Sequence, residues 1–197
     1  MTLTKQLKVL LAASALCLSA AAQAVTVDVK QAPTGFFVPT DLQKYDAPYY
    51  RWQNDDWGWT HNAIAGPITS AWLMVSAFDV DHAQGEVDNI YAYDGATKTL
   101  LSHLEGANDI WNFTFFALPA SFFDDIQAGL QVSMDIDVNL GGWAVTLAKS
   151  HLCVNADPNN YRTECAANPN PAPEPGSMAL LGAGLAGLAA LRRRKTA

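Results

Sequence analysis

Acidic side chains gather at the end of a long apolar stretch in the middle of the chain. They are Asp79, Asp81, Glu86 and Asp88. Carboxylate oxygens spaced closely in one loop are the hard ligands that Ca²⁺ prefers, and the ion takes about six to eight oxygens. The spacing is not that of an EF-hand, because Ala83 stands where that loop needs its third ligand. The segment therefore predicts either a calcium site or a solvated acidic loop.

Aromatic and polar side chains alternate in the segment NDDWGWTH, which ends at His61. Exposed tryptophan faces can stack on sugar rings, while neighbouring carboxylates fix the sugar hydroxyls. Candidate contacts for a polysaccharide are therefore Trp57, Trp59, Asp55 and Asp56. The competing interpretation, which the two-residue spacing favours, places both tryptophans in the core of a β-structure.

Residues for acid–base or nucleophilic catalysis do not form a recognisable set. The adjacent pairs Asp55-Asp56 and Asp124-Asp125 would point to opposite faces of a strand, so neither makes a carboxylate pair. The four histidines show no metal-binding spacing, and we expect them on the surface or in loops: His61, His82, His103 and His151. An enzyme needs a positioned set of such groups, so the sequence predicts a protein that is not an enzyme.

Charge is distributed unevenly along the 197 residues, whose formal net charge is −7. All 19 acidic residues lie within residues 25–175 together with six of the 12 basic residues, so this middle part carries −13. Such an acidic surface repels phosphate backbones, which argues against nucleic-acid binding. The middle part also holds every aromatic residue and is long enough to form one domain with its own core.

The first 24 residues have the pattern of a secretory signal peptide. Lys5 and Lys8 form a positive start, and an apolar run follows them. Ala22 and Ala24 then form a small-x-small cleavage site. We expect the Sec translocon to export the chain and a signal peptidase to cut after Ala24.

Cleavage would leave the mature chain with two cysteines, Cys153 and Cys165. An even number of cysteines in an oxidising compartment favours a disulfide bond. Closing a loop of about a dozen residues contributes roughly 3 kcal/mol in the chain-entropy account. A metal or redox pair is the alternative, but the spacing is not Cys-x-x-Cys.

The chain ends in a proline-rich spacer, an apolar run and a basic cluster. Residues 168–176 read NPNPAPEPG, the composition of an extended spacer. Residues 177–191 are uncharged and apolar, at the short limit for a transmembrane helix, which usually needs about 17 to 20 residues. Basic residues that follow such a helix favour the cytoplasmic side, which would place the body outside the inner membrane.

Three features at the C-terminus, in this order, resemble the PEP-CTERM protein-sorting signal, over residues 173–197. They are the motif Pro173, Glu174 and Pro175, the short apolar run, and the basic residues Arg192, Arg193 and Arg194. The resemblance implies recognition by an exosortase, a membrane cysteine protease of Gram-negative bacteria. It also implies a transient inner-membrane anchor, cleavage near the Pro-Glu-Pro motif, and transfer of the body to the cell surface or extracellular matrix. Such proteins usually accompany exopolysaccharide.

The body has the pattern of β-strands separated by turns. Apolar residues on both faces of residues 68–80 predict a central strand, and Asp94-Gly95 predicts a hairpin turn. Alternation in residues 130–138 places Val138 inward and Asp137 outward. Strands without long helices between them predict an all-β fold, an antiparallel sandwich or barrel.

The stretch from residue 65 to residue 152 resembles a recurrent bacterial jelly-roll module of the galactose-binding-like type. The matching positions are Gly85 to Asp88, Leu104, Gly106, Trp111 to Phe115, Leu118, Pro119, Leu130 and Gly142 to Leu147. The resemblance implies a jelly-roll-like β-sandwich, and many such modules bind carbohydrate or calcium.

These patterns divide the chain into a signal peptide, a sandwich, a spacer that begins with the disulfide, and a sorting signal that contains the membrane helix 177–191. Their bounds are residues 1–24, 25–155, 156–175 and 173–197. We expect an exported, non-catalytic structural or adhesive protein associated with exopolysaccharide. The alternatives are a calcium-assisted carbohydrate-binding module and an enzyme acting on the same polymer.

Overall fold

The computed structural model describes residues 24–31, 43–47 and 49–166. Residues 25–170 form one compact unit, called the body below. The predicted signal segment up to residue 23, the spacer beyond residue 166 and the sorting signal with its helix 177–191 lie outside the described residues. Within the described residues, no helix is long and apolar enough to cross a membrane.

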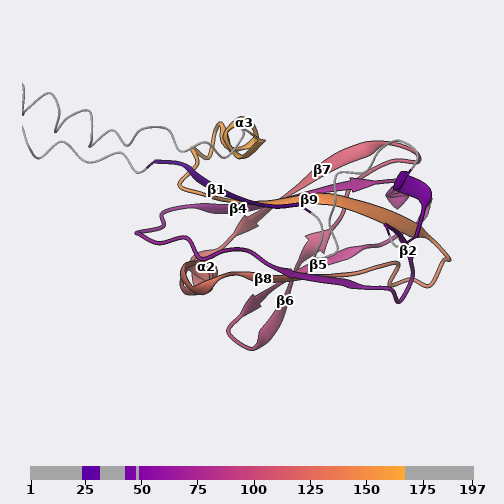
Figure 1. Ribbon diagram of the computed structural model, residues 1–197, viewed down its shortest axis with the longest axis horizontal. Helices are drawn as coiled ribbons and strands as arrows, with labels where there is room; N and C mark the ends of the chain where they lie inside the picture. Colours follow the sequence, from indigo (N-terminus) through magenta and orange to yellow (C-terminus); the bar gives the residue numbers. More distant parts are fainter. Residues whose placement is uncertain (1–23, 32–42, 48, 167–197) are drawn as a thin grey trace, which may run out of the picture. The chain divides into compact units, whose positions relative to one another are not determined.

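Two antiparallel sheets make up the body, and Figure 1 shows them as two layers. The first sheet has the order β1-β9-β4-β7, and β2 pairs with the end of β9 that β1 leaves free. Its strands are β1 (Thr26–Gln31), β2 (Tyr50–Trp52), β4 (Ala71–Phe78), β7 (Trp111–Leu118) and β9 (Ala144–Val154).

The second sheet has the order β3-β8-β5-β6. Its strands are β3 (Trp57–Thr60), β5 (Asn89–Asp94), β6 (Thr97–His103) and β8 (Gln131–Asp135). From β2 onward the chain changes sheet at every connection except the β5–β6 hairpin. The predicted hairpin is present, but Asp94 still pairs with Thr97, so its two turn residues are Gly95 and Ala96, one position later than predicted.

Alternating side chains of the two sheets meet in one hydrophobic core. Leu73 and Val75 of β4 contribute from the first sheet, and Ile90 and Val132 contribute from the second. The even-numbered residues of β4 therefore face outward, away from the second sheet. The predicted central strand is confirmed, because β4 lies between β9 and β7.

Short helices lie in the connections. They are the 3-10 turns η2 (Gln43–Tyr45), η3 (His82–Gln84) and η4 (Ala120–Phe122), and the helices α2 (Phe123–Ala128) and α3 (Tyr161–Ala166). Two of them, η2 and α3, contact the outer face of the first sheet. Helix α3 packs beyond the predicted end of the sandwich at residue 155, so the folded body continues to residue 166.

One predicted alternation breaks down at the end of β8. Asp137 is fully buried and Val138 is 41% exposed, the reverse of the prediction. The reason is local: the strand ends at Asp135, and Asp137 adopts a left-handed backbone with φ of 46°. Such a conformation turns the chain and ends the two-residue period that places side chains in a strand.

Candidate functional site

The loop that follows β4 carries the acidic residues singled out from the sequence. Asp79, the first of them, has both carboxylate oxygens occupied. Its Oδ2 accepts a hydrogen bond of 2.7 Å from the Tyr50 hydroxyl, and its Oδ1 accepts one of 2.8 Å from the backbone N–H of Asp109. Gly106 allows the loop of Asp109 to approach this closely, since a Cβ there would stand 2.6 Å from Cβ of Val80. Asp79 therefore connects the loop after β4 both to Tyr50 of β2 and to the loop that contains Asp109.

The other three residues form the buried acidic cluster: Asp81, Glu86 and Asp88. Asp81 is 5% exposed, and Glu86 and Asp88 are fully buried. Glu86 Oε2 accepts the backbone N–H of Asp81, and Asp88 Oδ1 accepts that of Asp137 at 2.9 Å. Three buried oxygens of the cluster, Asp81 Oδ1, Glu86 Oε1 and Asp88 Oδ2, have no donor other than the proton that Glu86 and Asp88 can share. The expectation of a solvated acidic loop is therefore wrong.

Burial and mutual repulsion dominate the electrostatics of this cluster. Burial, reinforced by the charge of Asp88, raises the pKa of Glu86 to about 9. Burial also raises the pKa of Asp88 to about 6, although the backbone N–H of Asp137 opposes the shift. For Asp81, burial and the charge of Asp79 both raise the pKa. A buried carboxylate costs free energy unless it is paired, so the cluster needs a proton or a cation close to it.

Asp137, beside the cluster, is a site residue that the sequence prediction placed on the surface. Its Oδ1 accepts the N–H of Gly141 at 3.1 Å. Its Oδ2 accepts those of Gly142 at 2.7 Å and Trp143 at 3.1 Å. Gly142 has a φ of 85°, which a glycine adopts without strain. The signal available in the sequence was an aspartate placed shortly before a Gly-Gly turn.

The carboxyl groups of the buried acidic cluster could supply only part of the oxygens that a calcium ion needs. Within the described residues, no three acidic, histidine or cysteine side chains stand in an arrangement that could hold a metal by themselves. Ca²⁺ also takes backbone carbonyls and water, and its shell needs about six to eight oxygens. The three unpartnered oxygens fit the chemistry of such a shell, which backbone carbonyls or water would have to complete.

The predicted sugar contacts Trp57 and Trp59 lie in the core. They are 3% and 4% exposed, so neither presents a face to a ligand, and that prediction is wrong. The guanidinium of Arg51 covers the Trp57 ring at 4.2 Å from its centroid. The two tryptophans share the inward face of β3, which is the competing interpretation of their spacing.

Asp55 and Asp56 remain on the surface next to these tryptophans. Both side chains are exposed, and Asp56 Oδ1 accepts the backbone N–H of Ile136 at 2.9 Å. Asp56 therefore connects the turn before β3 to the end of β8.

A hydrogen-bonded Ser-His-Asp chain, which the sequence gave no sign of, lies between the sheets. His61 Nδ1 is 2.8 Å from Asp28 Oδ2, and His61 Nε2 is 2.9 Å from Ser150 Oγ. Asp28 belongs to β1 and Ser150 to β9, and His61 follows β3. We call these three residues the histidine network.

The order of burial in the histidine network is the reverse of that in a serine hydrolase, where the serine is the accessible residue. Ser150 is fully buried and His61 is 1% exposed, whereas the Asp28 side chain is 14% exposed. A nucleophile must reach its substrate, and here the serine lies deepest. The expectation of histidines on the surface or in loops is wrong for His151, which lies in β9 and is 4% exposed; His61 lies in a loop, as expected, but its side chain is buried.

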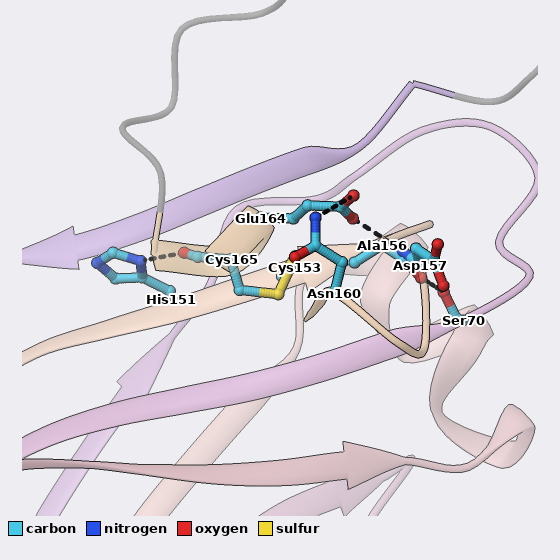
Figure 2. The surroundings of a disulfide bond; sticks show 8 residues. All are labelled: Ser70, His151, Cys153, Ala156, Asp157, Asn160, Glu164 and Cys165. Atoms are coloured by element: carbon cyan, nitrogen blue, oxygen red, sulfur yellow. Dashed lines mark hydrogen bonds between the residues drawn. A yellow bond between two sulfur atoms is a disulfide. The ribbon is translucent and has the colours of Figure 1, made fainter. Parts of the chain in front are cut away.

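Helix α3 is fixed to the first sheet by a disulfide between Cys153 and Cys165, as Figure 2 shows. The Nδ1 atom of His151, in β9, lies 2.8 Å from the carbonyl oxygen of Cys165. The Tyr161 ring stacks on Trp72 with centroids 3.7 Å apart. The link closes a separation of 12 residues and contributes roughly 3 kcal/mol in the chain-entropy account.

Comparison with known proteins gives one family match, at the end of the chain. Residues 171–195 match the PEP-CTERM protein-sorting motif. The match contains the Pro-Glu-Pro motif and the arginines identified from the sequence. It indicates a protein that an exosortase processes and sorts to the cell surface. No curated protein matches the chain.

Proposed function

We propose that the body is a non-catalytic structural or adhesive component of the cell surface or extracellular matrix, where it associates with exopolysaccharide. The observation that carries the proposal is the sorting motif that follows a disulfide-bonded β-sandwich. A β-sandwich with a disulfide bond suits a protein that functions outside the cell, because disulfides persist in that oxidising environment. In this proposal the Sec translocon exports the chain, the signal segment is removed after Ala24, and residues 177–191 anchor it in the inner membrane until the exosortase cuts.

Two further observations support the proposal. The alternation of strands between the sheets is compatible with a jelly-roll of the galactose-binding-like type, a fold that serves many binding proteins. The buried position of Ser150 argues against acyl transfer at the histidine network. The alternative of a glycan-active enzyme is tested by incubating the exported protein with exopolysaccharide, and release of reducing ends would contradict the proposal.

The sorting step is tested by comparing host strains with and without an exosortase. We expect the body on the outside of cells that have the enzyme, and in the inner-membrane fraction of cells that lack it. Glu174→Ala should cause the same retention, whereas Pro169→Ala, in the spacer outside the matched residues, should not. Equal surface exposure in both strains would contradict the proposal.

A second candidate function is calcium binding at the buried acidic cluster, and it rests on a specific observation. Three buried carboxylate oxygens, on Asp81, Glu86 and Asp88, lack any donor other than a shared proton. One divalent cation beside them would stabilise the ionised carboxylates, which burial disfavours at both Glu86 and Asp88 and which the charge of Asp88 further disfavours at Glu86. Asp79 lies outside this set, because its oxygens are already bound by Tyr50 and Asp109.

Equilibrium dialysis with radioactive calcium tests this candidate directly. We expect one bound ion per chain, and none in the double variant Glu86→Gln with Asp88→Asn. Asp124→Asn, at an acidic residue of α2 remote in sequence from the cluster, is the matched control and should bind like the unaltered protein. Absence of bound calcium in the unaltered protein would remove the candidate.

A further inference from the structure

A row of aromatic rings crosses the outer face of the first sheet. The odd-numbered residues of β4 belong to the core, so Phe78 lies on the opposite face. The strand register pairs Phe78 with Trp111 of β7 on one side and with Thr146 of β9 on the other. Thr146 in turn pairs with Tyr50 of β2. Side chains from four strands therefore share one line across the sheet.

Consecutive rings in this line are in contact, and Tyr45 of η2 joins the two halves. The ring centroids are 5.2 Å apart for Trp111 and Phe78, and 5.2 Å for Phe78 and Tyr45. They are 5.8 Å apart for Tyr45 and Tyr50, and 5.9 Å for Tyr50 and Trp52. We call these five residues the aromatic row. Edge contacts of this kind hold each ring in a defined orientation.

Three rings of the aromatic row remain open to solvent. Trp52 is 56% exposed, Tyr45 is 46% exposed and Trp111 is 36% exposed. Four adjacent strands extend over about 14 Å, so the exposed rings are distributed along a line and are not gathered at one point. A stepped line of aromatic faces fits an extended ligand of repeating rings better than a single small molecule.

Acidic groups surround the aromatic row. Asp109 accepts a hydrogen bond from the Tyr45 hydroxyl, and Asp46 follows Tyr45 directly in the chain. Asp55 and Asp56 follow Trp52 and are exposed, as are Asp46 and Asp109. Lys44 lies over two rings of the row, 4.4 Å from the centroid of Phe78 and 5.4 Å from that of Tyr45. Arg51 lies over the core ring of Trp57 at 4.2 Å. The four exposed aspartates outnumber these two cations, in keeping with the negative charge of the body.

From this placement we propose that the aromatic row binds a polysaccharide whose sugars carry ammonium groups, such as a glucosamine polymer. The rings stack on the apolar faces of successive sugars, and the exposed carboxylates of Asp46, Asp55 and Asp109 attract the ammonium groups. The same charges repel uronic-acid polymers. This inference rests on the proposed association with exopolysaccharide and assigns it a surface and a ligand class.

Calorimetric titration of the exported protein with glucosamine hexamer tests the inference. We expect binding that weakens as salt is added, and weaker binding of the N-acetylated hexamer and of an oligogalacturonide. Trp52→Ala and Trp111→Ala should each weaken binding about three- to tenfold. Leu100→Ala is the matched control, because this apolar residue is 53% exposed on β6 of the second sheet.

Three results would overturn the inference: no binding of the glucosamine hexamer, equal binding of its N-acetylated form, or unchanged binding after both tryptophans are replaced. Unaltered melting temperatures of the variants show that they fold. Because the titration uses purified protein, its failure leaves the sorting proposal intact. A sorting failure in cells would likewise leave the binding result unchanged.

Discussion

The sandwich contains two buried polar networks that differ in how many of their atoms have partners. In the histidine network, both ring nitrogens of His61 are engaged, and Asn62 donates two further hydrogen bonds to Asp28. In the buried acidic cluster, three oxygens have no donor outside the cluster. The first network pairs donors with acceptors throughout, whereas the side chains of the second are all carboxyl groups, whose one available donor is the proton that Glu86 retains because its pKa is raised to about 9.

This difference assigns the two networks different roles. A fully partnered network stabilises the fold, because every buried polar atom keeps the hydrogen bond that it would have in water. A cluster of acceptors destabilises the fold until a proton or a cation joins it. The histidine network therefore connects β1 to the rest of the body, and the buried acidic cluster is the place where a ligand would add stability.

The largest expected effect concerns the histidine network. His61→Leu removes the central group and leaves Ser150 and part of Asp28 without a partner. We expect the free energy of unfolding to fall by about 3 kcal/mol, measured by urea denaturation. Ser150→Ala removes one hydrogen bond only and should cost about 1 kcal/mol. A loss below about 0.5 kcal/mol for His61→Leu would show that the network is not structural.

Two substitutions at and beside the buried acidic cluster should change the stability of the protein in opposite directions. In calcium-free buffer, Glu86→Gln removes a buried acid whose burial raises its pKa to about 9, and should stabilise the protein by about 1 kcal/mol. Asp137→Asn is the matched control, because its carboxylate accepts three backbone N–H groups. That change should cost about 2 kcal/mol. Equal losses from both variants would contradict the comparison.

The smallest expected effect is a pH dependence that His61 contributes. Burial lowers the pKa of His61 more than contact with Asp28 raises it. Burial raises the pKa of Asp28, but hydrogen bonds from His61 and Asn62 lower it overall. Both folded-state pKa values lie below the unfolded ones, so stability is complete above about pH 6.5 and falls as the pH decreases.

Unfolding curves between about pH 7 and pH 5 measure this contribution. Lys30 and His151 also act on His61 or respond to it, so the comparison must be made against a variant. His61→Gln keeps a polar group that does not titrate. Between about pH 7 and pH 5 the variant should lose about 1 kcal/mol less stability than the unaltered protein loses. Parallel curves for the two proteins would show that His61 does not titrate there.

The strands and the disulfide were predictable because their signals are local. Alternation marked β4 and β7, Asp94-Gly95 marked the hairpin, and two cysteines in an exported chain marked the link to α3. The histidine network was not predictable, because Asp28 and Ser150 meet through the pairing of β1 with β9, and His61 reaches them only because the end of β3, in the second sheet, packs against that pair. The two-residue spacing of Trp57 and Trp59 favoured their burial, whereas the burial of Glu86 depends on the packing of the sheets, which residue spacing does not encode.

The difference between the histidine network and the buried acidic cluster is tested most directly by the melting temperature of the exported protein, measured once with a chelator and once with millimolar calcium. Free calcium at about a hundred times the Kd of the site raises the free energy of unfolding by about 2.7 kcal/mol, which corresponds to an increase in melting temperature of about 5 to 10 °C. We expect this increase in the unaltered protein and no increase in the double variant Glu86→Gln with Asp88→Asn. An identical melting temperature with and without calcium would contradict it, and would mean that Glu86 and Asp88 only share a proton.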